Sequence, residues 1–167
     1  MARRLIETGV RSIEVSLTGF DTHANNHEGQ KTQANIFDPA LASLLAELRE
    51  KDLLDSTIVM LLTEFGRTPV INPAGGRDHF PHWFSGVIAG GGFRKGAVIG
   101  ETSSESLGEN SGRGKNKPKP KDPVTIPQLY ATVLQSMGID YAHEVETPIG
   151  RPMKYTSGQP MPALLEG

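Results

Sequence analysis

Three short segments of this chain place acidic and histidine side chains in turns that follow apolar stretches. They are Gly19–His23 (Gly-Phe-Asp-Thr-His), Thr63–Thr68 (Thr-Glu-Phe-Gly-Arg-Thr) and Gly75–His79 (Gly-Gly-Arg-Asp-His). Carboxylate and imidazole groups together form the ligand set of hydrolytic metal centres. In open α/β sheets, ligands bind in the crevice beyond the carboxyl ends of the strands. The three turns therefore predict a divalent metal site.

Five side chains in and near these turns are candidate metal ligands: Asp21, His23, His27, Glu64 and His79. The first two lie just past a predicted strand, and His27 follows His23 by four residues, a spacing that shares one face of a helix. Glu64 ends the second apolar run, where its carboxylate would face the same crevice. A two-metal site, with ions about 4 Å apart, needs such groups from several strand ends.

Each candidate also has a purely structural interpretation. An Asp-Thr-His turn such as that at Asp21 is often an Asx-type turn, whose carboxylate accepts from nearby backbone amides. Arg67 could neutralise Glu64 in an exposed ion pair worth roughly 0–1 kcal/mol, or it could bind an oxyanion in a bidentate manner. Threonine hydroxyls lie near the turns, but nothing marks one as an activated nucleophile, so the sequence names no catalytic residue.

The composition limits the classes of function. The 167 residues are 37% hydrophobic and 22% charged, which is ordinary for one globular domain with a sizeable core. A formal net charge of −2 provides no overall field for gathering nucleic acid. The absence of cysteine excludes disulfides and thiolate metal sites. No apolar run approaches the roughly 20 residues of a membrane span, and none follows Met1–Arg4 as in a signal peptide, so the compartment stays open.

Alternating helix and strand patterns surround the turns. We expect a helix over residues 2–8, ended by a glycine, and a strand over residues 12–17. An Asp-Pro pair predicts an amphipathic helix over residues 38–51. Apolar runs predict strands at residues 57–62 and 83–89. This order of elements predicts an α/β fold, with a mainly parallel sheet and helices on both faces.

The second half of the chain has fewer regular patterns. Residues 101–122 carry Gly, Ser and Asn, then lysines separated by Asn and Pro, which predicts a flexible, solvated loop. Thr125 and Gln128 form a capping-box pattern that opens a helix. Residues 147–167 are rich in Pro and Gly and predict an extended C-terminal arm or a hairpin. The whole chain, residues 1–167, is predicted to form a single α/β domain.

The same turns give the chain a resemblance to a known family. The segments Phe20–Asn26, Phe37–Ala40, Thr63–Pro69, Gly75–His79 and Gly90–Gly92 resemble the C-terminal part of the DUF1501 family. That family is often described as sulfatase-like and is similar to the alkaline phosphatase superfamily, which includes sulfatases and phosphodiesterases. The resemblance implies an alkaline-phosphatase-like sheet, of which this chain would supply the C-terminal portion as a fragment of a larger hydrolase domain.

The resemblance also implies ligands for a first metal ion. In the superfamily, an Asp and a His that follow one strand hold one metal. Asp21 with His23, or with His27, matches that pair, and His79 matches a later histidine that completes the site. Asp78 beside it is the implied supporting acid.

The match to the second metal site and to the substrate contacts is less complete. Glu64 stands where the superfamily has an acidic dipeptide for the second metal, but Phe65 replaces the usual histidine. Arg67 or Arg77 is the implied contact for the substrate oxyanion. The nucleophile of the superfamily has no match in this chain.

Two functions follow as hypotheses. The first is a metal-dependent hydrolase of sulfate or phosphate esters, which would act on a small anionic ester with Zn²⁺, or else Mn²⁺, Ca²⁺ or Mg²⁺, as its cofactor. The alternative is a non-catalytic binding or scaffold domain of the same fold. Neither predicts a nucleic-acid partner or a membrane span. We also expect self-association into a homo-oligomer, because a truncated sheet exposes an edge and apolar surface.

Overall fold

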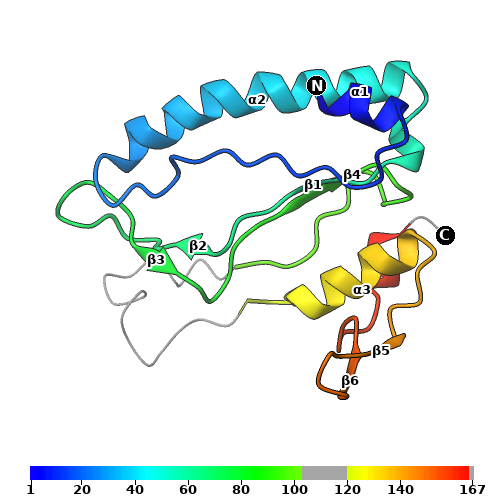
Figure 1. The fold of residues 1–167 in the computed structure, drawn as a ribbon. Coiled ribbons are helices and arrows are strands. Elements are labelled where there is room, and N and C mark those ends of the chain that lie inside the picture. The colour runs from blue at the N-terminus through cyan, green and yellow to red at the C-terminus, as the bar shows by residue number, and fades with distance from the viewer. Residues whose placement is uncertain (103–119, 166–167) are drawn as a thin grey trace. The chain divides into compact units, whose positions relative to one another are not determined.

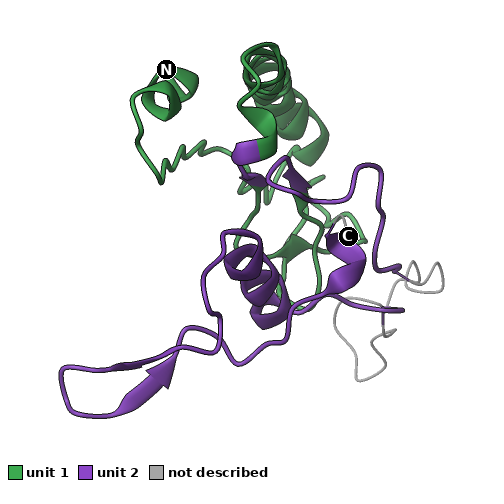
Figure 2. Ribbon diagram, turned by 90° about the vertical axis from the view of Figure 1, so that its right-hand side faces the viewer, with its two compact units in different colours: residues 1–55, 61–87, 104–118 green, residues 56–60, 88–103, 119–167 purple. Residues whose placement is uncertain are grey.

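The computed structural model describes residues 1–102 and 120–165 (Figure 1). The contacts divide the chain into two compact units (Figure 2). The described part of the first unit is residues 1–55 and 61–87, and that of the second is residues 56–60, 88–102 and 120–165. Every candidate site residue belongs to the first unit. Most of the predicted 101–122 loop lies outside the described residues.

Two helices, α1 (Ala2–Glu7) and α2 (Asn26–Glu50), dominate the first unit. α1 ends before Gly9, which takes a positive φ of 87°, so the predicted helix and its glycine stop are confirmed. Arg3 ties α1 to α2 because its Nε donates to Glu47 at 2.8 Å while its Nη1 contacts Glu7 at 2.5 Å. Leu48, on the apolar stripe predicted for the second helix, is fully buried.

The helix α2 begins at Asn26, much earlier than predicted. Asp38 and Pro39 lie inside it, so the predicted helix start at Asp38 is wrong. Residues 26–37 mix good helix formers (Glu, Lys, Ala and two Gln) with weaker ones such as Gly, Thr and Asn, and they are helical although Pro39 removes one backbone hydrogen bond. The helix is 25 residues long but polar. Among the helices of the described ranges, none combines the length and the apolar character that crossing a bilayer requires.

The strands near the candidate site are short. After the 3-10 helix η1 (Leu54–Ser56), β1 (Val59–Leu61) pairs with β4 (Val87–Ala89), and both lie within the predicted strands 57–62 and 83–89. Between them, β2 (Gly66–Arg67) pairs with β3 (His79–Phe80) in an antiparallel sheet. Phe80 is 2% exposed, and its ring packs edge-on against the ring of Trp83. This region therefore has a buried aromatic contact.

The strand predicted over residues 12–17 is not formed. These residues run as an extended segment before α2 (Figure 1). The side chain of Val15 is 79% exposed. An alternating pattern makes a strand only where a neighbour supplies backbone partners. The sheets of the described residues have two strands each, and both β2–β3 and β5–β6 are antiparallel. A parallel pair needs a crossover of about a dozen residues or more. The mainly parallel, alkaline-phosphatase-like sheet stays a prediction.

The second unit contains α3 (Ile126–Ser136), the strands β5 (Glu144–Glu146) and β6 (Pro152–Lys154), and the 3-10 helix η3 (Pro162–Leu164). The capping box of Thr125 and Gln128 forms as predicted. Within the predicted C-terminal arm, β6 pairs with β5, which lies just before the arm, in an antiparallel hairpin. Thr132 on α3 is fully buried, where its hydroxyl donates to Gln128 O at 2.7 Å and accepts from Met161 N at 3.0 Å.

Candidate metal centre

The first turns of α2 hold the turn that carries Asp21 and His23. The amide of Gln30 donates to Phe20 O at 3.2 Å and to the Thr22 hydroxyl at 3.1 Å. That hydroxyl in turn donates to Asn26 Oδ1 at 2.7 Å. A side chain at Gly29 would collide with Thr22, since an added Cβ would lie 2.5 Å from its Cγ2. The helix therefore fixes the position of the turn.

A second turn, from Asn72 to Asp78, docks against the first by backbone hydrogen bonds. Arg77 N donates to Thr22 O at 3.0 Å, and Asn26 N donates to Gly75 O at 2.9 Å. Gly75 also forms an antiparallel bridge with Ala24. Gly76 is buried, and an added Cβ would overlap the carbonyl of His23. The two turns, which are far apart in sequence, thus lie in backbone contact.

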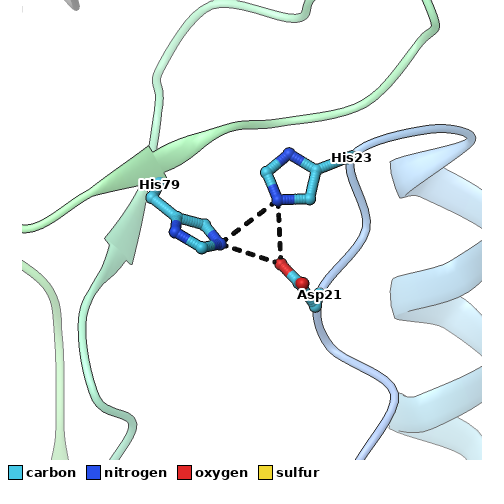
Figure 3. Close-up of side chains that lie close together, drawn as sticks. All are labelled: Asp21, His23 and His79. Carbon is cyan, nitrogen blue, oxygen red and sulfur yellow. Dashed lines mark hydrogen bonds and ion pairs between the residues drawn. The ribbon is translucent and has the colours of Figure 1, made fainter.

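This docking brings three of the predicted ligands together (Figure 3). The Oδ1 atom of Asp21 lies 3.1 Å from His23 Nε2 and 3.0 Å from His79 Nε2. The two Nε2 atoms are 3.2 Å apart. The side chains are 65%, 47% and 48% exposed for Asp21, His23 and His79, so the cluster is open to solvent.

No arrangement of protons makes all three of these contacts attractive. A ring nitrogen donates if it carries hydrogen and accepts if it does not, while the carboxylate of Asp21 only accepts. If both Nε2 atoms are protonated, two donors face each other. If only one is protonated, the other Nε2 is an acceptor that faces Oδ1. A cation shared by the three atoms would remove this conflict, so the cluster is a candidate cation site.

The donor set also fits a zinc ion. Bonds of about 2.0–2.1 Å in a tetrahedral zinc site place neighbouring ligand atoms about 3.3–3.4 Å apart. The observed separations of 3.0–3.2 Å differ from this by a few tenths of an ångström. Two imidazoles and one carboxylate also make up the ligand set of zinc hydrolases that keep a fourth position open.

Asp78 supports the ring of His23 from its other side. Its Oδ1 lies 2.9 Å from His23 Nδ1. A proton on Nδ1 that is donated to this carboxylate leaves Nε2 with a free lone pair, which points at Asp21 and His79. Histidine ligands of metal ions commonly have such a carboxylate partner, which fixes the tautomer and raises the basicity of the ring. Asp78 thus contacts a candidate ligand, and its supporting role stays a prediction.

Arg67 pairs with Asp21 rather than with Glu64. Its Nη2 lies 2.6 Å from Asp21 Oδ1, and its guanidinium stands over the ring of Phe65 at 5.8 Å. The antiparallel register of β2 and β3 causes this, because it sets Arg67 opposite His79. Hydrogen bonds from His79 first, and then from Arg67, lower the pKa of Asp21 to about 2. Asp21 is therefore charged at any pH near neutrality.

Three other predicted site residues lie outside this cluster. The ligand group contains neither His27, which is exposed in the first turn of α2, nor Glu64, which is exposed before β2. Arg77 directs Nη1 to the carbonyls of Thr68 at 2.6 Å and Pro69 at 2.7 Å, which gives it a structural role.

Sequence reasoning missed Asn72, which contacts both turns. The Asn-Pro pair at residues 72–73 is a turn signal that could have drawn attention to it.

Comparison with known proteins gives one match. The model of a family described as "Protein of unknown function (DUF1501)" matches residues 1–165. No curated protein and no solved structure matches the chain. The match covers both docked turns and all the candidate ligands. A relation to the alkaline phosphatase superfamily remains a prediction from the sequence.

Proposed function

This chain belongs to the DUF1501 family, and on that premise we propose that it binds one divalent cation, preferably Zn²⁺, through Asp21, His23 and His79. We propose further that the site serves the hydrolysis of a small sulfate or phosphate ester. The observation that carries the proposal is the triangle of Asp21 Oδ1 and the two Nε2 atoms, whose contacts no proton arrangement satisfies. When bound, Zn²⁺ acts as a Lewis acid that polarises an ester oxygen.

The surrounding side chains have distinct roles in this proposal. Asp78 keeps the Nε2 lone pair of His23 available, because its carboxylate accepts the proton of Nδ1. Arg67, which is 17% exposed and contacts Asp21, is the group that binds and orients the anionic part of the ester. A guanidinium suits this role because its planar set of donors matches the oxygens of sulfate and phosphate.

The preference for Zn²⁺ follows from the ligand types. Ca²⁺ and Mg²⁺ favour sites made of oxygen atoms, whereas imidazole nitrogens favour zinc and the later transition metals. Two histidines with one carboxylate also bind Fe²⁺ in some oxygenases. A metal titration should therefore compare Zn²⁺ with Mn²⁺, Fe²⁺ and Mg²⁺, and we expect the tightest binding for Zn²⁺.

One observation favours a non-catalytic binding domain as a second candidate. Arg67 already neutralises the carboxylate of Asp21 at 2.6 Å. In addition, the ligand side chains are half exposed, whereas catalytic electrostatics gain most where water is excluded. A chain that keeps this fold but neither binds the metal nor cleaves esters would have this second function.

Isothermal titration of the metal-free chain with Zn²⁺ tests the proposal. We expect one bound ion per chain, and we expect Asp21→Ala and His79→Ala to remove the binding. His27→Ala is the matched control, because it removes an exposed histidine nearby that lies outside the cluster. Cleavage of p-nitrophenyl sulfate or phosphate by the zinc-loaded chain, lost in Asp21→Ala, would support the hydrolase. Binding without cleavage would support the metal site but not the hydrolase. Absence of binding would support the second candidate, and equal binding by all variants would contradict the proposed ligands.

A further inference from the structure

Asn72 connects the two docked turns through all four hydrogen-bonding positions of its carboxamide. Its Nδ2 donates to His23 O at 2.9 Å and to Asp78 Oδ1 at 3.1 Å. Its Oδ1 accepts from Ala74 N at 3.0 Å and from Gly76 N at 2.9 Å. A carboxamide offers two N–H donors and two oxygen lone pairs, so every hydrogen-bonding position of this side chain has a partner.

The orientation of the Asn72 carboxamide follows from its partners. The two groups that face Nδ2 are a carbonyl and a carboxylate, which are acceptors. The two groups that face Oδ1 are backbone amides, which are donors. Exchanging the nitrogen and oxygen would place donors against donors and acceptors against acceptors at all four contacts, so the network admits only the observed orientation.

These contacts reach the candidate metal centre through His23. The Asp78 carboxylate oxygen that accepts from Asn72 is the same one that lies 2.9 Å from His23 Nδ1. Asn72 also holds the backbone carbonyl of His23, so it fixes both the main chain and the ring partner of this histidine. The hydrogen bonds described for the Asn72 side chain do not include Asp21 or His79.

We propose that Asn72 is a positioning residue of the metal centre, which holds Asp78 against His23 so that the Nε2 lone pair of His23 faces Asp21 and His79. The part of this inference that concerns metal affinity rests on the proposed function. The part that concerns the tautomer and placement of His23 does not. Outer partners of metal-ligating histidines are typically worth 10–100-fold in affinity.

The substitution Asn72→Asp separates positioning from folding of the turn. An aspartate keeps one oxygen to accept from Ala74 N and Gly76 N, so the turn is preserved. It loses both donors and sets a second carboxylate beside Asp78. Simple charge attraction would make this added negative charge strengthen cation binding. Weaker binding would therefore reveal loss of position rather than a change of charge.

Asn26→Asp is the control for the added charge. Asn26 lies at the start of α2 and contacts the same region, but its Oδ1 only accepts, from the Thr22 hydroxyl at 2.7 Å. An aspartate can keep that contact. We expect zinc affinity in Asn26→Asp to stay equal to that of the unaltered chain or to rise, while Asn72→Asp binds about 10–100-fold more weakly.

The test combines zinc titration with nitrogen-15 NMR of the histidine rings in the metal-free protein near pH 8, with the His23 signals assigned from a His23→Ala spectrum. We expect His23 to be protonated at Nδ1 in the unaltered chain and to become a mixture of tautomers in Asn72→Asp. If circular dichroism shows that Asn72→Asp is unfolded, Asn72→Ser replaces it, because a serine hydroxyl can also accept from the turn amides.

A folded variant with an unchanged His23 tautomer and unchanged zinc affinity would overturn the inference. If the unaltered chain binds no zinc but the His23 tautomer still shifts in Asn72→Asp, the positioning role is supported and the proposed function fails. If zinc binds and neither measurement responds to the substitution, the proposed function stands and the role of Asn72 fails.

Discussion

Replacing Asp78 with asparagine removes the charge that supports His23 and leaves the shape of the side chain unchanged. The Asp78–His23 contact is 2.9 Å long, and the two side chains are 38% and 47% exposed. Exposed pairs of this kind contribute at most about 1 kcal/mol to folding. We therefore expect the metal-free variant to unfold within about 1 kcal/mol of the unaltered chain.

The effect on zinc binding should be larger than the effect on folding. Loss of an outer carboxylate typically weakens metal binding by about 10-fold or more, which corresponds to about 1.4 kcal/mol. At a zinc concentration of 100 times the dissociation constant, binding stabilises the unaltered chain by about 2.7 kcal/mol, and a 10-fold loss of affinity leaves about 1.4 kcal/mol. For a chain of this length, these values correspond to rises in melting temperature of about 5–11 °C and about 3–6 °C.

Thermal unfolding with and without zinc measures both quantities in one experiment. Asp38→Asn is the matched control, since it removes the same charge from an exposed position in α2 away from the turns. It should keep the full zinc-dependent rise. If Asp78→Asn also keeps the full rise, Asp78 does not support a metal ligand, and the tautomer argument for His23 is refuted.

Three further predictions concern the turn at the site and the helices of the two units. Gly76→Ala should destabilise the first unit by about 1–3 kcal/mol, measured by urea unfolding, and should abolish the zinc response, because its Cβ would overlap the carbonyl of His23. Arg3 lowers the pKa of Glu47, so this contact stabilises above the unfolded-state pKa near 4.5 and is lost as the pH falls through the lower folded-state value. Glu47→Gln should therefore reduce stability at pH 7 and do so progressively less as the pH falls below 4.5, and a loss that stays equal at all pH values would contradict the contact. Thr125→Ala should cost α3 about 0.5–2 kcal/mol by denaturant titration, and an unchanged midpoint would show that its capping box contributes nothing.

The sequence was sufficient for features that depend on local chemistry. The capping box at Thr125 and the glycine stop at Gly9 involve residues next to each other in the chain, and both formed as predicted. The helix start at Asp38 was wrong because local signals compete with the packing of Gln30 on the preceding turn, which a propensity scale does not contain. The strand at residues 12–17 failed for a related reason, because pairing depends on a distant partner.

The site shows the same division between local and distant effects. Residue types alone pointed to Asp21, His23 and His79, because carboxylate and imidazole at turns are typical of metal sites. Spacing could not exclude His27, whose position depends on where α2 begins. It also could not show that Arg67 would pair with Asp21, since that contact follows from the register of β2 and β3.

Anomalous diffraction at the zinc absorption edge, from crystals of this chain grown with zinc, would locate the bound metal ion itself. We predict one strong peak, in contact with the carboxylate of Asp21 and with Nε2 of both His23 and His79. The proposed metal centre would be contradicted if no anomalous peak lay beside these three side chains, or if the zinc were bound by other residues.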